Sequence, residues 1–500
     1  MEYGILSLLP PLLIILMVII TKKVVTSLFS GVVVGCIIIG DFSFTSFIQS
    51  IKSTVLSVFF TDGSLNSSNL SILLFLVLLG LLTGFINILE GNRAFTEFVR
   101  KKIGTKKGAQ ASTAAVSLTL FPDDVFNMFT VGQIAQPIFD SFGIARQKLA
   151  YIIHTVSDSL CVLFPVSSWG AYIISILTVI FTQQNYELNG LTAFLQIGPY
   201  NFYAVTGLLF IFLIIYLEVD FSNMKKASNK NSMQNIQTTA ITHSSIMDLL
   251  LPIVTLLIIV MTSIIVTGYM GSEEFTLLSI FENANISLSL IIGTTCALLV
   301  ALILFCIKVF KQKSLALTSA KDAVSNGLKA TLPAIIILIF AWMVSNNTSE
   351  LQTGEYLASF INKIAFPSNF LPLVAFLFTG VMAFSTGTSW GTFAIMLPIT
   401  AEIALSSDET LLIPILAAVL AGSLFGDHCS PISDTTTVAS AAAGCSQMDH
   451  FSTQWPYSLT VASIAAMGYL FFALTSSIFL SYLFIITCIT LVAFKLKNSK

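Results

Sequence analysis

Charged side chains are scarce in this 500-residue chain, and their scarcity excludes several classes of protein. They make up 10% of the residues, against roughly 25% in soluble domains, whereas 55% of the residues are hydrophobic. The formal net charge of −2 provides no basic face, so we expect no nucleic-acid partner. A mean hydropathy of +0.90 is typical of a protein that has the lipid bilayer as its surroundings.

Motifs for nucleotides, structural metals and hydrolysis are also missing. No Gly-rich phosphate-binding loop occurs, so we expect no cofactor and no work driven by ATP. The seven cysteines lack the spacing of a disulfide framework, and those near His428 and His450 match no zinc-binding pattern, so we expect no structural metal. A G-x-S-x-G pattern at 387–391 lies between apolar helical segments rather than after a strand, so we expect no enzyme.

What the chain does contain is a series of apolar segments long enough to cross a bilayer, which takes about 20 helical residues. These segments are 5–21, 24–40, 70–90, 199–218, 247–270, 286–308, 329–346, 457–475 and 478–495. Four more are apolar on both sides of a polar break: 109–139, 149–180, 370–405 and 411–445. Backbone freed at such a break is tolerated in a membrane only where it lines a cavity or is covered by protein.

Lys and Arg predict how the segments thread the membrane, because basic loops stay in the cytoplasm. They gather around 22–23, 93–107, 146–148, 225–230, 308–321 and 495–500, whereas 183–198, 271–285 and 402–410 carry acids only. One threading satisfies this distribution. It makes 109–139 and 370–405 re-entrant hairpins and 149–180 and 411–445 broken spans. The chain then lies in the cell membrane with the N-terminus outside and the C-terminus in the cytoplasm.

This threading predicts an all-α integral membrane protein with an inverted repeat, about 11 spanning helices, two re-entrant hairpins and two broken helices. The predicted parts are a first repeat at 1–218, a flexible cytoplasmic linker at 219–246, a second repeat at 247–475 and an extra C-terminal helix at 476–500. Inverted repeats are a common plan of secondary transporters, whose sites lie where the breaks meet.

The sequence at the four breaks resembles the NhaC family of sodium/proton antiporters. The strings are Asp-Asp-Val-Phe-Asn-Met-Phe-Thr-Val-Gly at 123–132, Pro-Val-Ser-Ser-Trp-Gly-Ala-Tyr at 165–172, Thr-Gly-Thr-Ser-Trp-Gly-Thr-Phe at 386–393 and Gly-Asp-His-Cys-Ser-Pro-Ile-Ser-Asp-Thr-Thr at 426–436. The resemblance implies a transporter that extrudes Na⁺ in exchange for H⁺, and a homodimer is compatible with it. Relatives of the family exchange organic acids with cations, so the resemblance leaves open a small organic anion or amino acid as substrate, as in malate/lactate exchange.

The breaks supply the oxygen atoms that a hard cation such as Na⁺ needs. The candidate cation- and proton-binding residues are Asp123, Asp124, Asn127, Asp158, Asp427 and Asp434, of which Asp124, Asp427 and Asp434 are the first candidates for the exchanging carboxylate. The candidate supporting ligands or substrate contacts are Thr130, Ser167, Ser168, Thr386, Thr388, Ser389, Ser430, Ser433, Thr435 and Thr436.

Each candidate also has a structural interpretation. The Ser and Thr hydroxyls are suited to cap backbone groups freed at the breaks. Asp123 and Asp124 are adjacent, so we expect one to face a cavity and the other to cap a helix N-terminus. Asp434 is an alternative N-cap, and Asp158 is suited to a hydrogen bond with a neighbouring helix. His428 is either a candidate proton relay, because an imidazole titrates near neutral pH, or a structural histidine.

The sequence therefore predicts a secondary active Na⁺/H⁺ antiporter that works by alternating access, with Na⁺ as transported ion only. The alternative is a Na⁺- or H⁺-coupled exchanger of a small organic anion or amino acid.

Overall fold

The computed structural model describes residues 3–498 except 22, 62–63, 92–93, 95–102, 121, 231–244, 273–279, 281–282, 354–355, 357–358, 360–366 and 432. Within these residues the fold is helical apart from a short antiparallel ribbon of β1 (Phe60–Thr61) and β2 (Ser64–Leu65). The helices of the first part are α1 (Leu9–Thr21), α2 (Val24–Ile39), α3 (Phe44–Phe59), α4 (Ser67–Ile88), α6 (Lys106–Thr119), α7 (Asp124–Ser141), α8 (Arg146–Cys161), α9 (Ser168–Gln183), α10 (Gly190–Ile197), α11 (Phe202–Leu217) and α12 (Ser222–Lys230). Those of the second part are α13 (Met247–Gly271), α15 (Ile286–Cys306), α16 (Ser319–Glu350), α18 (Leu371–Thr386), α19 (Ser389–Ser407), α20 (Leu412–His428), α21 (Asp434–Ala443), α22 (Gln447–Thr475) and α23 (Ile478–Asn498).

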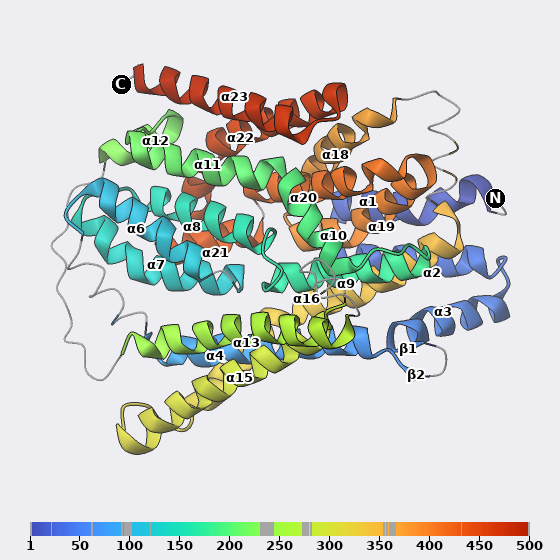
Figure 1. Cartoon of the computed structure of the whole chain (residues 1–500), viewed down its shortest axis with the longest axis horizontal. Coiled ribbons are helices and arrows are strands. Elements are labelled where there is room, and N and C mark those ends of the chain that lie inside the picture. Colours follow the sequence, from blue (N-terminus) through green and yellow to red (C-terminus); the bar gives the residue numbers. More distant parts are fainter. Residues whose placement is uncertain are drawn as a thin grey trace.

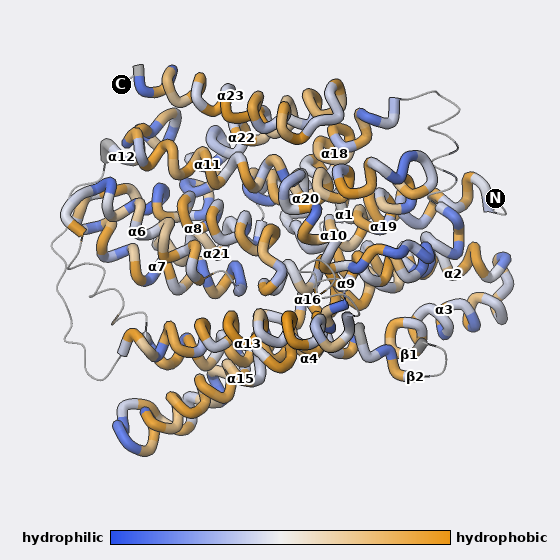
Figure 2. The backbone as a smooth tube through the Cα atoms, viewed as in Figure 1, coloured by the Kyte–Doolittle hydropathy of each residue, from blue (hydrophilic) through white to orange (hydrophobic). Residues whose placement is uncertain are grey.

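The described helices confirm a multi-pass membrane protein. Nine of them are long and apolar enough to cross a bilayer, or ten if α10 and α11, which meet at 51°, form one span. This number is roughly consistent with the predicted 11. In α13, α15 and α23, at most a third of the most apolar stretch is buried inside the protein. These helices lie at opposite edges of the molecule with apolar residues along their length (Figures 1 and 2), as expected for contact with lipid.

Each of the four predicted breaks is present, and each is capped in the same way. The helix that follows a break begins with a side chain that accepts a backbone N–H from three residues further on. Asp123 accepts from Phe126 at the start of α7, Ser167 from Gly170 in α9, Thr388 from Gly391 in α19, and Ser433 from Thr436 in α21. Such caps satisfy backbone donors that have no partner within their own helix, which is essential where water is excluded.

The broken helices and hairpins of the two halves pack reciprocally. Helix α21, from the second half, contacts α7 of the first hairpin, and α9, from the first half, contacts α19 of the second hairpin. Each hairpin also packs against the broken helix of its own half, α7 on α8 and α18 on α20. This arrangement is what the predicted inverted repeat requires, although the division into repeats at 218 and 247 stays a prediction.

Helices α4 and α16 approach each other closely through glycine. A Cβ atom at Gly84 would lie 2.1 Å from the carbonyl oxygen of Ala323, and one at Gly327 would lie 2.1 Å from the carbonyl oxygen of Gly80. No side chain fits at these distances, so glycine sets the spacing of the two helices.

One expectation about a connection needs correction. The linker 219–246 was expected to be flexible, but its residues 222–230 form α12, which packs against α22 and α8; residues 231–244 lie outside the described part. Within the acidic connection 183–198, which was expected on the outer side, residues 190–197 form α10 and pack against α9. Of the predicted basic loop, Arg93 and residues 100–102 lie outside the described part.

Candidate functional site

A cavity of about 160 Å³ lies where the N-termini of α7, α9, α19 and α21 converge. Its lining residues are Leu76, Asp123, Asp124, Val125, Ser168, Ala330, Thr331, Pro333, Ile337, Thr388, Trp390, Asp434, Thr435 and Val438. All four breaks thus contribute to one site, with α4 and α16 as the remaining wall. Two larger hollows, of about 380 and 640 Å³, have no charged side chain among the described residues that line them.

Helix ends and carboxylates balance each other in this cavity. The N-terminus of a helix carries roughly half a positive charge, so four converging N-termini favour negative groups. Asp123 supplies one of these groups, but its Oδ1 is used to cap α7 by accepting from the Phe126 N–H at 2.9 Å. Asp124 is 4% exposed and also lines the cavity. The cap expected from one of the two adjacent acids is therefore Asp123.

Asp434 is the carboxylate that the second half contributes to the cavity. It is exposed, and its Oδ1 accepts from the backbone N–H of Thr435 at 3.0 Å. The alternative that Asp434 is an N-cap is wrong, because Ser433 holds that position and Asp434 is the first residue of α21. Its carboxylate is thus available in the cavity.

Asp427 is placed differently from Asp434, although only seven residues separate them. It is 1% exposed and is not among the residues that line the cavity. Ser389 Oγ donates to its Oδ2 at 3.0 Å, and Ser433 Oγ donates to its Oδ1. The Asp427 carboxylate therefore ties the second hairpin to the second broken helix.

Most of the other candidate hydroxyl and amide groups serve the freed backbone. In the first hairpin, Asn127 Nδ2 donates to the Ser117 carbonyl at 2.7 Å and Asn127 Oδ1 accepts from Ser117 Oγ at 2.8 Å. In the second half, Ser430 Oγ donates to the Phe384 carbonyl at 2.8 Å.

The remaining candidates of this kind bind backbone carbonyls or lie apart from the cavity. Ser167 Oγ donates to the Cys161 carbonyl, Thr386 Oγ1 to the Ala383 carbonyl and Thr436 Oγ1 to the Ser430 carbonyl. Thr130 is buried and does not line the cavity. The candidates on the cavity wall are therefore Asp123, Asp124, Ser168, Thr388, Asp434 and Thr435.

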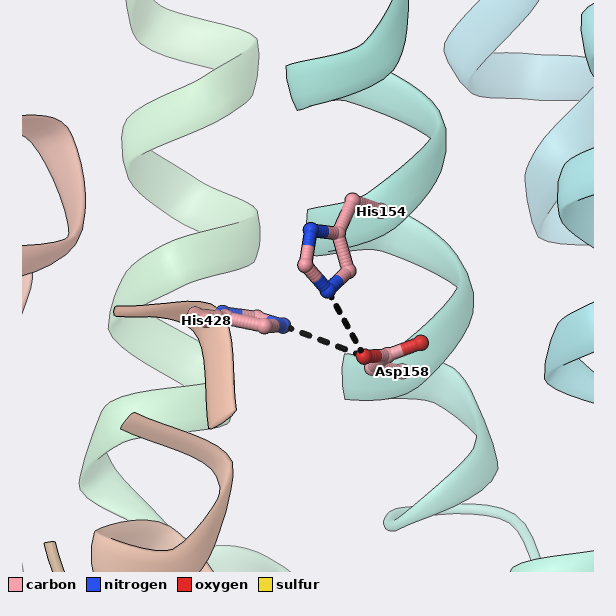
Figure 3. A group of neighbouring side chains, drawn as sticks. All are labelled: His154, Asp158 and His428. Carbon is pink, nitrogen blue, oxygen red and sulfur yellow. Dashed lines mark ion pairs between the residues drawn. The ribbon is translucent and has the colours of Figure 1, made fainter. Parts of the chain in front are cut away.

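Asp158 and His428 belong to a buried polar cluster next to the cavity (Figure 3). Asp158 Oδ2 lies 3.3 Å from His154 Nε2 and 3.4 Å from His428 Nε2, and all three side chains are at most 2% exposed. His154 Nδ1 is 3.0 Å from His450 Nε2, and His428 Nδ1 is 3.1 Å from the Tyr203 hydroxyl. Three of the four histidines of the chain therefore meet here.

Thr435 joins this histidine cluster to the cavity. Its Oγ1 lies 2.9 Å from His154 Nε2 and 2.9 Å from Ser433 Oγ, which in turn donates to Asp427. A continuous set of polar contacts thus runs from the cavity wall to Asp158 and Asp427.

Sequence reasoning did not single out His154, Tyr203 or Gln454 as functional candidates, and it considered His450 only for zinc spacing. Gln454 Nε2 donates to the His428 carbonyl at 3.0 Å and lies 3.1 Å from His154 Nδ1. One observation was available for His154: it precedes Asp158 by four residues within a predicted helix, a spacing that places both on one face. Nothing in the sequence indicates Tyr203.

Comparison with known proteins agrees with these features. The model of the Na⁺/H⁺ antiporter family matches residues 160–474. An uncharacterized protein of Haemophilus influenzae is 36% identical over 482 residues, which is 95% of this chain and 92% of that protein. The malate-2H⁺/Na⁺-lactate antiporter of Bacillus subtilis is 36% identical over 133 residues, 25% of this chain and 26% of that protein.

Among solved structures, the YdaH transporter of Alcanivorax borkumensis shares the fold at a TM-score of 0.58, with 12% identity over 85% of this chain and 88% of that one. Family and fold neighbours are transporters rather than enzymes, as the sequence predicts. The chain therefore belongs to the Na⁺/H⁺ antiporter family.

Proposed function

We propose that the chain is a Na⁺/H⁺ antiporter that extrudes Na⁺ in exchange for H⁺ and binds both ions at the cavity between the four breaks. The observation that carries this proposal is the meeting of Asp124, from α7, and Asp434, from α21, in a 160 Å³ cavity at four helix N-termini. The two carboxylates come from different halves of the chain. The affinity for a cation held between them therefore depends on the relative position of the first hairpin and the second broken helix.

The cavity offers the ligands that Na⁺ prefers. The cavity wall contains the hydroxyl groups of Ser168, Thr388 and Thr435 in addition to the two carboxylates. A hard cation is coordinated by such oxygen atoms. A proton bound to one of these carboxylates removes part of the negative charge that holds Na⁺. Protons and Na⁺ therefore compete for the site, which is the condition for exchange rather than cotransport.

Alternating access places the site in contact with one side of the membrane at a time. The predicted orientation has the N-terminus outside and the C-terminus in the cytoplasm, so that Na⁺ leaves the cell as H⁺ enters. Reciprocal packing of α7 with α21 and of α9 with α19 couples the two hairpins to each other through the ion site.

A second candidate is the exchange of a small organic anion with Na⁺ or H⁺, and the cavity wall favours it. Leu76, Ile337, Val438 and the ring of Trp390 line one site together with four helix N-termini. Helix N-termini bind carboxylates, and an apolar wall is superfluous for Na⁺ alone. The similarity to the malate-2H⁺/Na⁺-lactate antiporter, which covers about a quarter of the chain, also supports this candidate.

Lumenal pH in proteoliposomes distinguishes the two functions. A Na⁺ gradient is imposed in buffer free of organic acids, with the native protein, Asp434→Asn, and Asp322→Asn as a matched control at an exposed carboxylate outside the cavity. Antiport predicts that Na⁺ alone moves protons with the native protein and with Asp322→Asn but not with Asp434→Asn. If Na⁺ moves no protons until malate, lactate or an amino acid is added, the organic-solute exchanger replaces the antiporter.

A further inference from the structure

We propose that His154, Asp158 and His428 form a binding site for a divalent transition-metal ion of the Zn²⁺ and Co²⁺ class. This site goes beyond the proposed ion exchange and does not depend on it. It also departs from the expectation drawn from the sequence, because its ligands come from α8 and α20 and have no zinc-like spacing along the chain.

The geometry of the three side chains fits such an ion. Their ligand atoms, His154 Nε2, His428 Nε2 and Asp158 Oδ2, all lie within 4.8 Å of one another. The two imidazole nitrogens are 3.3 and 3.4 Å from the carboxylate oxygen, and both point toward it in Figure 3. Ligands of a tetrahedral Zn²⁺ at about 2.0–2.1 Å are about 3.3 Å apart. The carboxylate edges of the site are therefore already at the separation that coordination requires.

Two of these atoms make polar contacts only inside the group of three. Asp158 Oδ2 and His428 Nε2 are fully buried, form no hydrogen bond of good geometry within the described residues, and meet only at the contacts of 3.3 and 3.4 Å given above. Such incomplete pairing of buried polar atoms is rare because the lost hydration is not fully compensated. A metal ion between them satisfies both atoms at once.

The other ring nitrogen of each histidine and the other oxygen of Asp158 also have polar neighbours. His154 Nδ1 lies 3.0 Å from His450 Nε2, and His428 Nδ1 lies 3.1 Å from the Tyr203 hydroxyl. Ser157 Oγ donates to Asp158 Oδ1 at 3.2 Å. Contacts of this kind orient a ligating imidazole and determine which nitrogen faces the metal.

The donor set decides the class of ion. Two imidazoles and one carboxylate suit Zn²⁺, Co²⁺ and similar ions, whereas Na⁺, Mg²⁺ and Ca²⁺ prefer oxygen alone. Thr435 lies between this site and the cavity, because its Oγ1 is 2.9 Å from His154 Nε2 and the residue lines the cavity.

Cobalt provides a test that does not involve transport. Purified full-length protein in detergent is stripped with a chelator and titrated with Co²⁺, and the visible d–d absorption of tetrahedral Co²⁺ is recorded. Zn²⁺ is then added to displace it, and bound metal is counted after dialysis. The expected result is a saturable absorption band, one metal ion per chain, displacement by Zn²⁺ and no competition by excess Na⁺.

Variants assign the band to these residues. Asp158→Asn and His428→Gln are each expected to abolish it, whereas Asp434→Asn, the same substitution at a carboxylate of the adjacent cavity, is expected to retain it. His450→Gln is expected to keep the band with an affinity about 10–100-fold lower, since His450 acts through His154. If either ligand variant fails to fold, the other is read alone. No band with the native protein, or an unchanged band in a folded ligand variant, would overturn the proposal.

Discussion

His154 Nε2 lies 2.9 Å from Oγ1 of Thr435, and this contact joins the first broken helix to the resumed half of the second. The two residues are 281 positions apart in the chain. Thr435 belongs to the cavity wall and also touches the buried histidine cluster, so the hydroxyl group is the point where the two meet. A change at Thr435 is therefore expected to act on ion exchange without altering the cavity carboxylates.

Replacing Thr435 by valine removes this hydroxyl while keeping the shape of the side chain. We expect Thr435→Val to lower the rate of Na⁺-driven proton movement about tenfold or more. The variant loses the hydrogen bond to His154, and a loss of about 1.4 kcal/mol corresponds to a factor of ten in rate. Thr435→Ser keeps the hydroxyl and is expected to retain the native rate. The measurement is the initial rate of lumenal pH change in proteoliposomes. Equal rates in the two variants would contradict a role for the hydroxyl group.

Competition between Na⁺ and H⁺ for the cavity carboxylates predicts a specific pH dependence. Where the carboxylates are protonated, each further drop of one pH unit is expected to raise the apparent KM for Na⁺ about tenfold, because one proton must leave for each Na⁺ that binds. The maximal rate at saturating Na⁺ changes much less. Initial rates measured over a matrix of pH and Na⁺ concentrations test this, and a KM independent of pH would separate the proton site from the Na⁺ site.

Gly327 tests whether the close approach of α4 and α16 matters for the cavity that they wall. A Cβ there meets backbone at 2.1 Å, so neither helix can give way by rotating a side chain. We expect Gly327→Ala to lower stability by about 1–3 kcal/mol. Gly104→Ala is the matched control, since no atom of the described residues lies within 4 Å of a Cβ at Gly104. Thermal unfolding in detergent compares the two variants, and equal midpoints would show that the helices separate without cost.

Ser433 caps α21 and also donates to Asp427, so its loss is expected to cost more than an ordinary cap. Ser446 caps α22 by accepting from the Asp449 N–H at 3.1 Å. We expect Ser446→Ala to cost about 1 kcal/mol and Ser433→Ala about 1–3 kcal/mol more, because Asp427 is then left with an unsatisfied buried oxygen. Unfolding midpoints of the two variants measure the difference. A cost for Ser433→Ala no greater than for Ser446→Ala would mean that the bond to Asp427 contributes little.

An ion pair beside α12 makes stability depend on pH. Lys148 is 1% exposed and its ammonium contacts Asp220, which also accepts from Ser228 Oγ at 2.9 Å. Burial alone would raise the pKa of Asp220, but the Lys148 charge and these hydrogen bonds hold that pKa below its usual value. The stabilisation is therefore present above the unfolded pKa of about 3.9 and is lost as the pH falls through the lower folded pKa.

Asp220→Asn is accordingly expected to cost about 3 kcal/mol at neutral pH, because it leaves a buried ammonium without its counter-charge. The matched control is Asp140→Asn, which breaks a pair with Arg146, whose side chain is 36% exposed, and is expected to cost less than about 1 kcal/mol. Unfolding midpoints followed from neutral to acid pH should show the difference between native protein and Asp220→Asn shrinking only below about pH 4. A difference that is constant down to lower pH would exclude the ion pair as its cause.

Most of the scaffold could be predicted from the chain because lipid constrains it strongly. Apolar runs must become helices where no water satisfies the backbone, and the polar strings around Asp123, Ser167, Thr388 and Ser433 are incompatible with an uninterrupted span. The breaks and their caps follow from these local rules. Helix α10 could not be predicted, because its eight residues, which include the polar Thr192 and Gln196, are too few to be distinguished from a loop without the surface of α9.

The sequence by itself thus determined a membrane protein with four interrupted helices rich in oxygen atoms, because hydropathy and capping act within a few residues. Only the tertiary structure decided which oxygen atoms face the cavity. Asp434 and Asp427 belong to the same motif, yet one lines the cavity and the other is bound by Ser389 from the second hairpin. The meeting of His154 with His428 and His450 was likewise decided by helix packing, since contacts between distant segments depend on how whole helices are oriented against each other.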